Sequence, residues 1–249
     1  MNWVWAVKNS TIYDLNLHLH TVLSPCAGLN MTPAQIIDEA HQKEIDIIGI
    51  TDHNSAGNVE VAVELAREQN IKVIPGLEVE TKEEVHCLCL FEKVREALKL
   101  QDFIRQHLPD QKNVEDFFGY QIKTNLKDEY EQKEEIMLAA AVNISLSRLL
   151  ERVYEEDGIL IPAHVLRSQG LIYQLGFIPQ ELDLPVLEVA DEDSISELCQ
   201  EYPQKVFIKN QDSHRLAEIK RGFSLKLPEP SFAAVKSVFV GRQKEKIII

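Results

Sequence analysis

Several features that would place the chain in a specialised class are missing from its 249 residues. No apolar run approaches the length of a membrane-spanning helix, and the opening MNWVWAVKNS lacks the long apolar core of a signal peptide. The four cysteines form no CxxC pair, so reduced thiols are expected rather than a disulfide framework. These absences predict a cytoplasmic protein that has no membrane partner.

Positive charge is also scarce. Lys and Arg number 26 against 40 Asp and Glu, which gives a formal net charge of −14, and no basic stretch is interleaved with aromatic residues. Because contact with a nucleic-acid backbone favours clusters of Lys and Arg, this balance predicts that the chain does not bind long nucleic acid. A small phosphorylated substrate is still compatible, since bound cations would locally reverse the sign of the field.

What the chain does contain is an alternation of apolar strands and amphipathic helices. Hydrophobic residues make up 45%, which excludes wholesale disorder, and the length suits a single α/β barrel. Thr32 and Pro33 form a typical helix start. Continuous apolar strands with helices between them indicate a parallel sheet. The seven predicted strands are 13–20, 45–50, 72–75, 85–91, 158–163, 185–190 and 205–209.

The segment 100–150 interrupts this alternation. Residues 128–135 are nearly all polar, and 136–154 have a helical pattern. We expect one domain over 1–249 with a small insertion at 100–150 that leans over the barrel mouth as a lid or substrate clamp. A packing appendage is the alternative. A last helix is predicted near 231–238, and the terminal Lys-Ile-Ile-Ile is an edge strand or a tail.

Side chains that can hold a metal follow six of the seven strands. In a barrel of parallel strands the carboxyl ends share one mouth, so these side chains would converge. Imidazoles and carboxylates packed together would repel or stay protonated without a cation. Each one taken alone could be a polar residue satisfied near a strand end, but their recurrence predicts a multinuclear metal site. They are His18, His20, Asp52, His53, Glu78, His86, His164, Asp212 and His214.

The order of these motifs resembles the PHP (polymerase and histidinol phosphatase) family. The match spans roughly 13–215, with only 100–150 lacking a family motif. The resemblance implies a distorted seven-stranded (β/α) barrel of parallel strands that holds up to three divalent metals and hydrolyses phosphate esters. The motifs are His18-Leu19-His20, Thr51-Asp52-His53, Gly76-Leu77-Glu78 with His86 soon after, Ala163-His164, and Asp212-Ser213-His214.

The resemblance also implies how the ligands divide among two to three divalent ions. Mixed imidazole and carboxylate ligation suits zinc, manganese or iron, and ligand type alone does not choose among them. A carboxylate bridge would screen the repulsion between two neighbouring cations. The first ion would be held by His18, His20, Glu78 and Asp212, the second by Glu78, His86 and His164, and the third by His53, His214 and a residue from the loop after the first strand.

Two positions depart from the family pattern. Cys26 falls where the ligand from the first loop usually lies, and a thiolate there would favour zinc or ferrous iron. The alternative is a packed thiol with a weak or empty third site. Asn16 stands where an Asp commonly precedes His-x-His, and it can still hydrogen-bond a ligand histidine but brings less charge.

These expectations describe a metal-dependent phosphoesterase in which an activated water attacks phosphorus. Asp52 or His214 would pass protons, and a protonated His53 would support a leaving oxygen. Arg167 and Arg215 are the best placed to bind the phosphate, ahead of Lys209 and Arg221. The alternative for each of these cations is an exposed charge on an acidic protein.

Other functions fit parts of the pattern. Related barrels share much of this ligand set, so a metal-dependent hydrolase of C–N or C–O bonds is the rival enzyme. A metal-binding regulatory module without catalysis is the rival outside enzymes, although its complete ligand set argues against lost activity. Oligomeric state is open, as is the substrate among a nucleotide, a short oligonucleotide end, an amino-alcohol phosphate such as histidinol phosphate, and a sugar phosphate.

Overall fold

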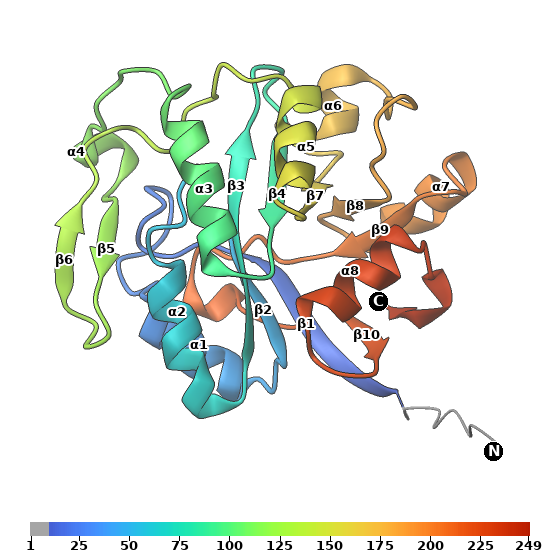
Figure 1. Ribbon diagram of the computed structural model, residues 1–249, viewed down its shortest axis with the longest axis horizontal. Coiled ribbons are helices and arrows are strands. Elements are labelled where there is room, and N and C mark those ends of the chain that lie inside the picture. Colours follow the sequence, from blue (N-terminus) through green and yellow to red (C-terminus); the bar gives the residue numbers. More distant parts are fainter. Residues whose placement is uncertain (1–9) are drawn as a thin grey trace.

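Seven strands form one curled sheet in the order β11-β10-β1-β2-β3-β4-β7 in the computed structural model, which describes residues 10–249 (Figure 1). β1, β2 and β3 are parallel, whereas β4 is antiparallel to both β3 and β7, and β10 is antiparallel to β1 and β11. The terminal edge strand is confirmed by β11. The bounds are β1 (Thr11–Leu19), β2 (Ile47–Ile50), β3 (Lys72–Glu80), β4 (His86–Leu90), β7 (Ile159–Pro162), β10 (Phe223–Leu227) and β11 (Ile247–Ile248).

The prediction of a closed barrel of seven parallel strands is wrong, because the sheet is mixed and forms a half-barrel. Only residues 81–85 join β3 to β4, and a parallel crossover needs a dozen residues or more. The remaining predicted strands, β8 (Val186–Val189) and β9 (Val206–Lys209), form a separate parallel pair. Single contacts join this pair to the large sheet, including Val165 N–H to Glu188 O at 2.9 Å and a bridge between Leu19 and Ser213.

Two hydrophobic cores lie on opposite faces of the curled sheet. The strand period of two separates them: in β4, Leu88 and Leu90 belong to the inner core, and Cys87 and Cys89 to the outer one. Strands β8 and β9 contribute Val186, Val206 and Ile208 to the inner core, so they share the concave side without completing the ladder. All four cysteines have free thiols.

Helices α1, α2, α3 and α5 cover the outer face of the sheet, whereas α8 packs against the inner core (Figure 1). Thr32 Oγ1 accepts the Gln35 N–H and caps α1, as its sequence predicts, and Ser231 caps α8 in the same way. Among residues 10–249, no helix combines the length and apolar character needed to cross a membrane. The bounds are α1 (Pro33–Gln42), α2 (Val59–Ala66), α3 (Val94–Arg105), α5 (Leu146–Glu155), α6 (Leu171–Leu175), α7 (Asp193–Glu201) and α8 (Phe232–Val240).

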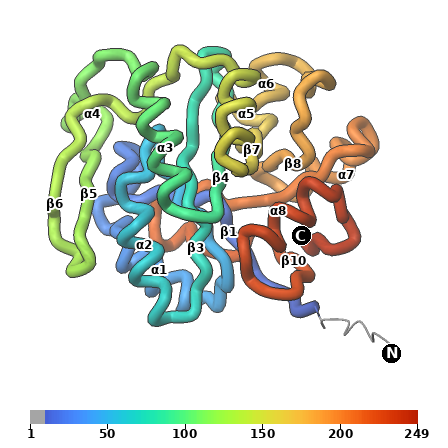
Figure 2. Tube along the Cα trace, in the orientation of Figure 1, coloured from blue at the N-terminus to red at the C-terminus, as the bar shows by residue number. Residues whose placement is uncertain are grey.

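The segment between α3 and α5 contains α4 (Glu115–Phe118) and a hairpin of β5 (Ile122–Thr124) and β6 (Tyr130–Lys133). The helix predicted over 136–154 begins only at Leu146. The hairpin lies beside α2 (Figure 2), where Asn58 Nδ2 donates to Ile122 O at 3.0 Å. Asn54 Nδ2 donates to the carbonyls of Leu138 and Ala140. Buried amides therefore join this segment to the loop after β2.

Gly119 brings the same segment against the loop after β1. Its φ of +100° lies in the left-handed region, and a Cβ atom there would lie 2.0 Å from the Pro25 carbonyl oxygen. Ile122 N–H also bonds to Val22 O at 3.0 Å. The segment thus contacts two of the loops that carry predicted site residues.

Gln121 offers a test of how firmly this segment is held. Its amide is fully buried and satisfies three backbone groups, the carbonyls of Glu134 and Ile136 and the N–H of Leu138. We expect Gln121→Ala to lower the free energy of unfolding by about 2–4 kcal/mol, because buried backbone groups would lose their partners. Equilibrium urea unfolding measures this, and Gln132→Ala on exposed β6 is the control, with a change within about 0.5 kcal/mol. Equal effects of the two substitutions would contradict the assignment.

Candidate metal centre

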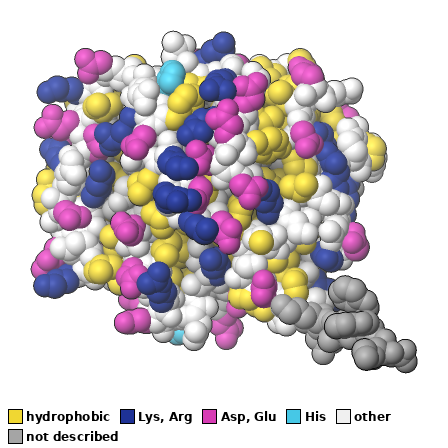
Figure 3. Space-filling model, viewed as in Figure 1, with side chains coloured by type: hydrophobic (Ala, Val, Ile, Leu, Met, Phe, Trp, Pro, Cys, Tyr) yellow, Lys and Arg dark blue, Asp and Glu magenta, His cyan; other side chains and the backbone are white. Residues whose placement is uncertain are grey.

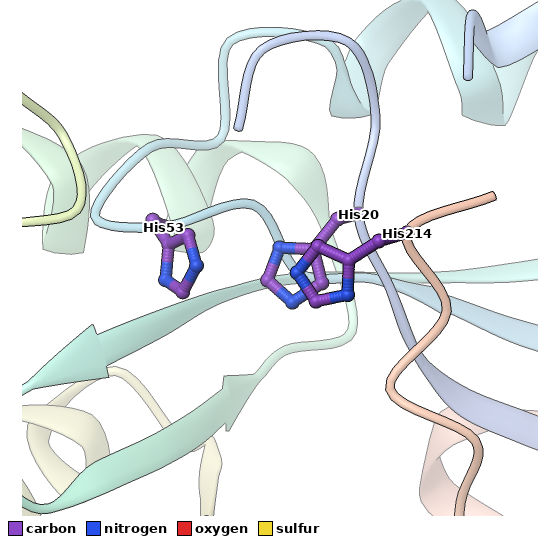
Figure 4. Close-up of side chains that lie close together, drawn as sticks. All are labelled: His20, His53 and His214. Atoms are coloured by element: carbon purple, nitrogen blue, oxygen red, sulfur yellow. The ribbon is translucent and has the colours of Figure 1, made fainter. Parts of the chain in front are cut away.

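Eight of the nine predicted metal-site side chains meet at one place on the concave side of the sheet. They come from the ends of β1 and β2, from β3 and β4, and from the loops after β7 and β9. Figure 4 shows three of them, with His53 on the loop after β2 facing the overlapping rings of His20 and His214. The eight are His18, His20, His53, Glu78, His86, His164, Asp212 and His214.

The carboxylate of Glu78 is the centre of this group. It is 1% exposed, and its neighbours Leu77 and Val79 belong to the outer core, so its side chain points to the concave side. Burial raises the pKa of Glu78, but the surrounding imidazoles outweigh burial and hold it well below its usual value. Oε1 lies 2.9 Å from Nδ1 of His86 and 3.3 Å from Nε2 of both His18 and His164, and Oε2 lies 3.2 Å from Nδ1 of His53 and 3.3 Å from Nε2 of His20.

Asp212 closes the opposite side of the His18–His20 pair. Its Oδ1 lies 3.3 Å from Nε2 of His18 and 3.4 Å from Nε2 of His20. Its Oδ2 accepts a hydrogen bond from the guanidinium of Arg167 at 3.0 Å. Burial raises the pKa of Asp212, but the imidazoles of His18 and His20 reverse that effect and the net shift is downward. Asp212 is therefore ionised at neutral pH.

The hydrogen bonds behind His20 fix the position of its ring proton. Ser24 Oγ donates to Asp52 Oδ1 at 2.7 Å and accepts the His53 N–H at 3.1 Å. Its only hydrogen is used, so Nδ1 of His20, 2.9 Å away, must donate to it. Nε2 of His20, which faces Glu78 and Asp212, is then the nitrogen that offers a lone pair to a cation once the ring is neutral.

This tautomer gives a test of whether the group fits a metal. Nε2 of His18 and Nε2 of His20 are 3.1 Å apart, and oxygens of Glu78 and Asp212 lie within 3.4 Å of them. Electron pairs that converge in a buried space repel unless a proton or a cation lies between them. Two imidazoles and two carboxylates are a suitable donor set for zinc, manganese or iron. The residues fit a divalent metal.

The protonation of the cluster without metal also indicates that these residues fit a cation. Burial lowers the pKa of His18, but the charges of Glu188, Glu78 and Asp212 outweigh it and hold this pKa well above its usual value. Burial also lowers the pKa of His86, and Glu78 and Glu80 reverse the shift and raise it to about 10. Without metal, protons on these rings therefore supply the positive charge that a metal cation would otherwise bring to the carboxylates.

Three sets of ligand atoms each lie close enough together to hold one ion. Two of the sets share Glu78, and the second of them contains His53 where the predicted one has His164, which contacts Glu78 Oε1. His20 appears with His53 and His214 as well as with His18, so the third set differs from the predicted one. The sets are His18, His20 and Glu78; His53, Glu78 and His86; and His20, His53 and His214.

His53 and His214 differ from His18 in charge. Burial lowers the pKa of His53 well below its usual value, and the neighbouring imidazoles of His20 and His86 lower it further, although Glu78 opposes the shift. Burial and His20 lower the pKa of His214 to about 4. The rings of His20 and His214 stack with centroids 4.2 Å apart. Both His53 and His214 are therefore neutral at pH 7 and can bind a cation or accept a proton.

Backbone strain collects at the same place. Asn54, His164 and Asp212 have φ values of +49°, +31° and +51°, in the left-handed region that side chains rarely adopt. Such conformations cost about 1–3 kcal/mol each and persist where the surroundings hold them. Nδ1 of His164 is also buried and has no hydrogen-bond partner within residues 10–249. The surrounding structure therefore holds these loops in strained conformations that direct their side chains into the cluster.

Cys26 does not belong to any of the ligand sets found in the described part of the chain. Cys26 is exposed at the surface, but the partial loss of hydration around its sulfur and the charge of Glu78 raise the pKa of the thiol to about 12, so without metal the sulfur keeps its proton. Asn16 is buried beneath the pair, where Oδ1 accepts the His18 N–H at 3.2 Å and Nδ2 donates to Lys220 O. It contacts the backbone of His18 rather than its ring.

The predicted catalytic and phosphate-binding residues lie around the cluster. Asp52 is fully buried, and its oxygens accept hydrogen bonds from Thr21 N–H, Thr21 Oγ1 and Ser24 Oγ at 2.6–2.7 Å. Arg167 is half exposed and bonded to Asp212. Arg215 is exposed, with its N–H bonded to Glu218 Oε2 at 3.1 Å.

Sequence reasoning missed Ser24 and Glu188. Glu188 is 1% exposed and lies in the middle of β8, where both of its oxygens contact Nδ1 of His18. The signal was present in the sequence, since a single Glu stands in the apolar run Val186-Leu187-Glu188-Val189 and a buried charge needs a partner. Ser24 carried no such signal, because a serine in a loop is common.

The fold is similar to that of several solved structures. A lesion-specific endonuclease from Pyrococcus furiosus and an Endonuclease Q in complex with a 27-mer duplex each match with TM-score 0.70 and 17% identity, over 93% of this chain and 56% and 57% of theirs. A two-domain protein from Bacteroides vulgatus, with a predicted PHP-like metal-dependent phosphoesterase, matches with TM-score 0.57 and 16% identity over 96% of this chain and 64% of that one. The chain spans less than two thirds of the length of all three. No curated protein matches it by sequence.

These structures correct the prediction that excluded long nucleic acid. The Endonuclease Q complex holds a 27-mer duplex with an abasic lesion at the active site. A formal charge of −14 describes the whole chain, whereas a phosphate responds to the field at the site it enters. Net charge was therefore not sufficient to exclude such a partner.

The order of the metal-site motifs resembled the PHP family, and the sequence model of that family matches this chain. The model of the PHP domain covers residues 16–210, which include all the metal-site side chains up to His164. Solved structures with this fold include a protein described as a PHP-like metal-dependent phosphoesterase. This chain belongs to the PHP domain family, whose members are metal-dependent hydrolases.

Proposed function

We propose that this protein is a metal-dependent phosphoesterase that hydrolyses a phosphate ester in DNA. The observation that carries the first part is the buried Glu78 carboxylate, in contact with five imidazoles. The likeness in fold to a lesion-specific endonuclease supports the second part. Divalent ions held by these side chains would supply the positive charge that activates water and offsets charge on the phosphoryl oxygens.

The ligands that we assign follow the contacts of Glu78. His18, His20, Glu78 and Asp212 would hold one ion, and Glu78 would bridge to a second ion held with His86 and His164. His53 and His214 would hold a third ion beside His20, whose single free lone pair, at Nε2, is assigned to the first ion. Cys26 as a further ligand stays a prediction, and its thiol would have to lose its proton on binding.

His214 suits a role in proton transfer at this site. Its Nδ1 lies 2.9 Å from Asp212 O and donates to that carbonyl, so Nε2 keeps its lone pair. A quarter of the His214 side chain is exposed, and its neutral ring can accept a proton at Nε2 while that nitrogen is not bound to the third ion. For Asp52 we favour a positioning role over proton transfer, because its three hydrogen bonds hold the loop that carries Ser24.

Arg167 is the cation that we assign to the substrate phosphate. Its guanidinium bonds to Asp212 on the open side of the cluster and is half exposed, so one face can meet an incoming anion. On the face seen in Figure 3, cations alternate with carboxylates. Lys99 on α3 and Arg148 and Arg152 on α5 pair with Glu156, Glu151 and Glu155, respectively. Phosphate binding is therefore expected at the mouth of the site rather than on this face.

The substrate class can be tested with protein loaded with zinc, manganese or iron. The panel comprises a DNA duplex with an abasic site, the same duplex intact, p-nitrophenyl phosphate and an amide substrate. We expect cleavage of DNA that is lost on chelation. Turnover of the amide alone would favour the rival C–N hydrolase, and metal binding without turnover of any substrate would favour a regulatory module.

Glu78→Gln is expected to lose metal and activity together. The amide offers one acceptor oxygen where the carboxylate offers two, so it cannot join both ligand sets. We expect at least one metal equivalent to be lost in elemental analysis and kcat to fall at least about 100-fold. Glu131→Gln on exposed β6 is the matched control and should change neither quantity. A Glu78→Gln protein with full metal content and turnover would remove the bridging assignment.

Metal binding is expected to release protons near neutral pH. Without metal the pKa values of His18 and His86 are raised, the latter to about 10, so both rings are protonated at pH 7. A metal must displace those protons, and its apparent affinity should rise as pH rises from neutral towards about 10. Calorimetric titration with zinc in two buffers of different ionisation enthalpy measures the release. Identical enthalpies in both buffers would show that the rings were already neutral.

Arg167→Ala is expected to weaken substrate binding and to leave metal content unchanged. Because the side chain is half exposed and screened by solvent, we expect roughly a fivefold loss of kcat/KM. Steady-state kinetics on the cleaved substrate measures this, with Arg148→Ala on α5 as the control. Loss of metal in the Arg167→Ala protein would instead assign this residue to support of Asp212.

A further inference from the structure

Glu188 is a buried charge that none of the family motifs in this chain includes. It is 1% exposed and lies in β8, opposite Ile208 of β9. Its Oε1 lies 3.0 Å from His18 Nδ1 and 3.1 Å from the His164 N–H, and its Oε2 lies 3.1 Å from His18 Nδ1 and 2.8 Å from Asn210 Nδ2. A lone carboxylate costs several kcal/mol to bury unless such partners satisfy it.

The partners of Glu188 all donate, and this determines the tautomer of His18. The backbone N–H of His164 can only donate. Asn210 is oriented by its other contact, in which Oδ1 accepts the Leu17 N–H at 2.8 Å, so Nδ2 faces Glu188. With these two donors already on the carboxylate, Nδ1 of His18, which contacts both of its oxygens, donates to it as well. Nε2 of His18, which faces Glu78 and Asp212, is then the nitrogen that gives up its proton and offers a lone pair when a metal binds.

Glu188 also holds the backbone of a second histidine. His164 has a φ of +31°, and its N–H is bonded to the Glu188 side chain while the next N–H, of Val165, is bonded to the Glu188 carbonyl. These two bonds join the loop after β7 to β8, where the large sheet and the β8–β9 pair meet without a ladder. Glu188 therefore fixes the side chain of His18 and the backbone of His164 where the two sheets meet.

We propose that Glu188 is a positioning residue for metal binding, which aims Nε2 of His18 at one ion and holds His164 in place for its neighbour. The proposal rests on the metal-dependent function proposed above. A glutamine cannot replace this carboxylate: its amide N–H₂ would face either the His164 N–H or the Asn210 amide, and each of these is a donor. An aspartate keeps the charge but is one methylene shorter.

The test compares Glu188→Gln and Glu188→Asp with Glu134→Gln. Glu134 is a matched control because its carboxylate is also buried and ion-paired, to Arg105, but lies in the insertion. Zinc alone is the probe, and its dissociation constant is measured by competition with a chromophoric chelator. We expect zinc to bind Glu188→Gln about 10–100-fold more weakly than the wild type, and Glu188→Asp to lie between them. Glu134→Gln should match the wild type.

A spectroscopic measurement separates positioning from general support of the fold. In the zinc-loaded protein with ¹⁵N-labelled histidine, long-range ¹H–¹⁵N spectra report which ring nitrogen carries hydrogen. Among the rings with a protonated Nδ1, we expect that of His18 to be altered in both Glu188 variants and unchanged in Glu134→Gln, and those of His20 and His214 to be unchanged in all three. If Glu188→Gln does not fold, Glu188→Asp decides, because it keeps the buried charge.

Wild-type zinc affinity with an unchanged histidine spectrum in either folded Glu188 variant would overturn the proposal. This outcome is distinct from failure of the proposed function. A wild-type protein that binds zinc tightly but cleaves no phosphate ester would refute the phosphoesterase and leave the role of Glu188 intact.

Discussion

The burial of the Glu78 carboxylate among imidazoles is the constraint on which the rest of this structure depends. An isolated carboxylate in such a place would cost several kcal/mol, so the chain must surround it with partners of opposite charge. Those partners come from β1, β4 and the loops after β2 and β7. The short connection between β3 and β4 contributes one of these partners, because it reverses the chain and brings Nδ1 of His86 to 2.9 Å from the carboxylate of Glu78, eight residues earlier.

The rings around Glu78 are in turn oriented from behind by two further carboxylates. Asp52 acts on His20 through Ser24, and Glu188 contacts His18 directly. The chain of hydrogen bonds from Asp52 continues through Thr21 Oγ1 to Asn58, and from Asn58 to the hairpin of β5 and β6. Because this network is buried and continuous, movement of the segment between α3 and α5 would break contacts that lead to the loop carrying Ser24. Mobility of the first loop would disturb His20.

The predictions from sequence succeeded where the cause is local. A metal-site residue at a strand end is visible as a polar residue after an apolar run, and the period of two already pairs His18 with His20. Strand direction is not local. β4 is antiparallel to β3 because only five residues lie between Glu80 and His86. The connection could not be recognised as this short from the sequence, because β3 was predicted to end near Pro75 and instead extends to Glu80. The helix predicted from 136 begins at 146, because Gln121 binds the backbone of 136–138 in another conformation.

The same distinction explains why net charge misled about nucleic acid. The excess of 14 negative charges is spread over a surface on which carboxylates pair with cations, as Lys99 does with Glu156. The cluster differs because the Glu78 carboxylate is buried and neutralised by imidazoles. Bound divalent ions would make the mouth positive. Interactions between exposed charges are screened within about 10 Å in salt, so a phosphate at the mouth would respond to that local charge rather than to the distant carboxylates. An acidic chain can therefore present a positive site.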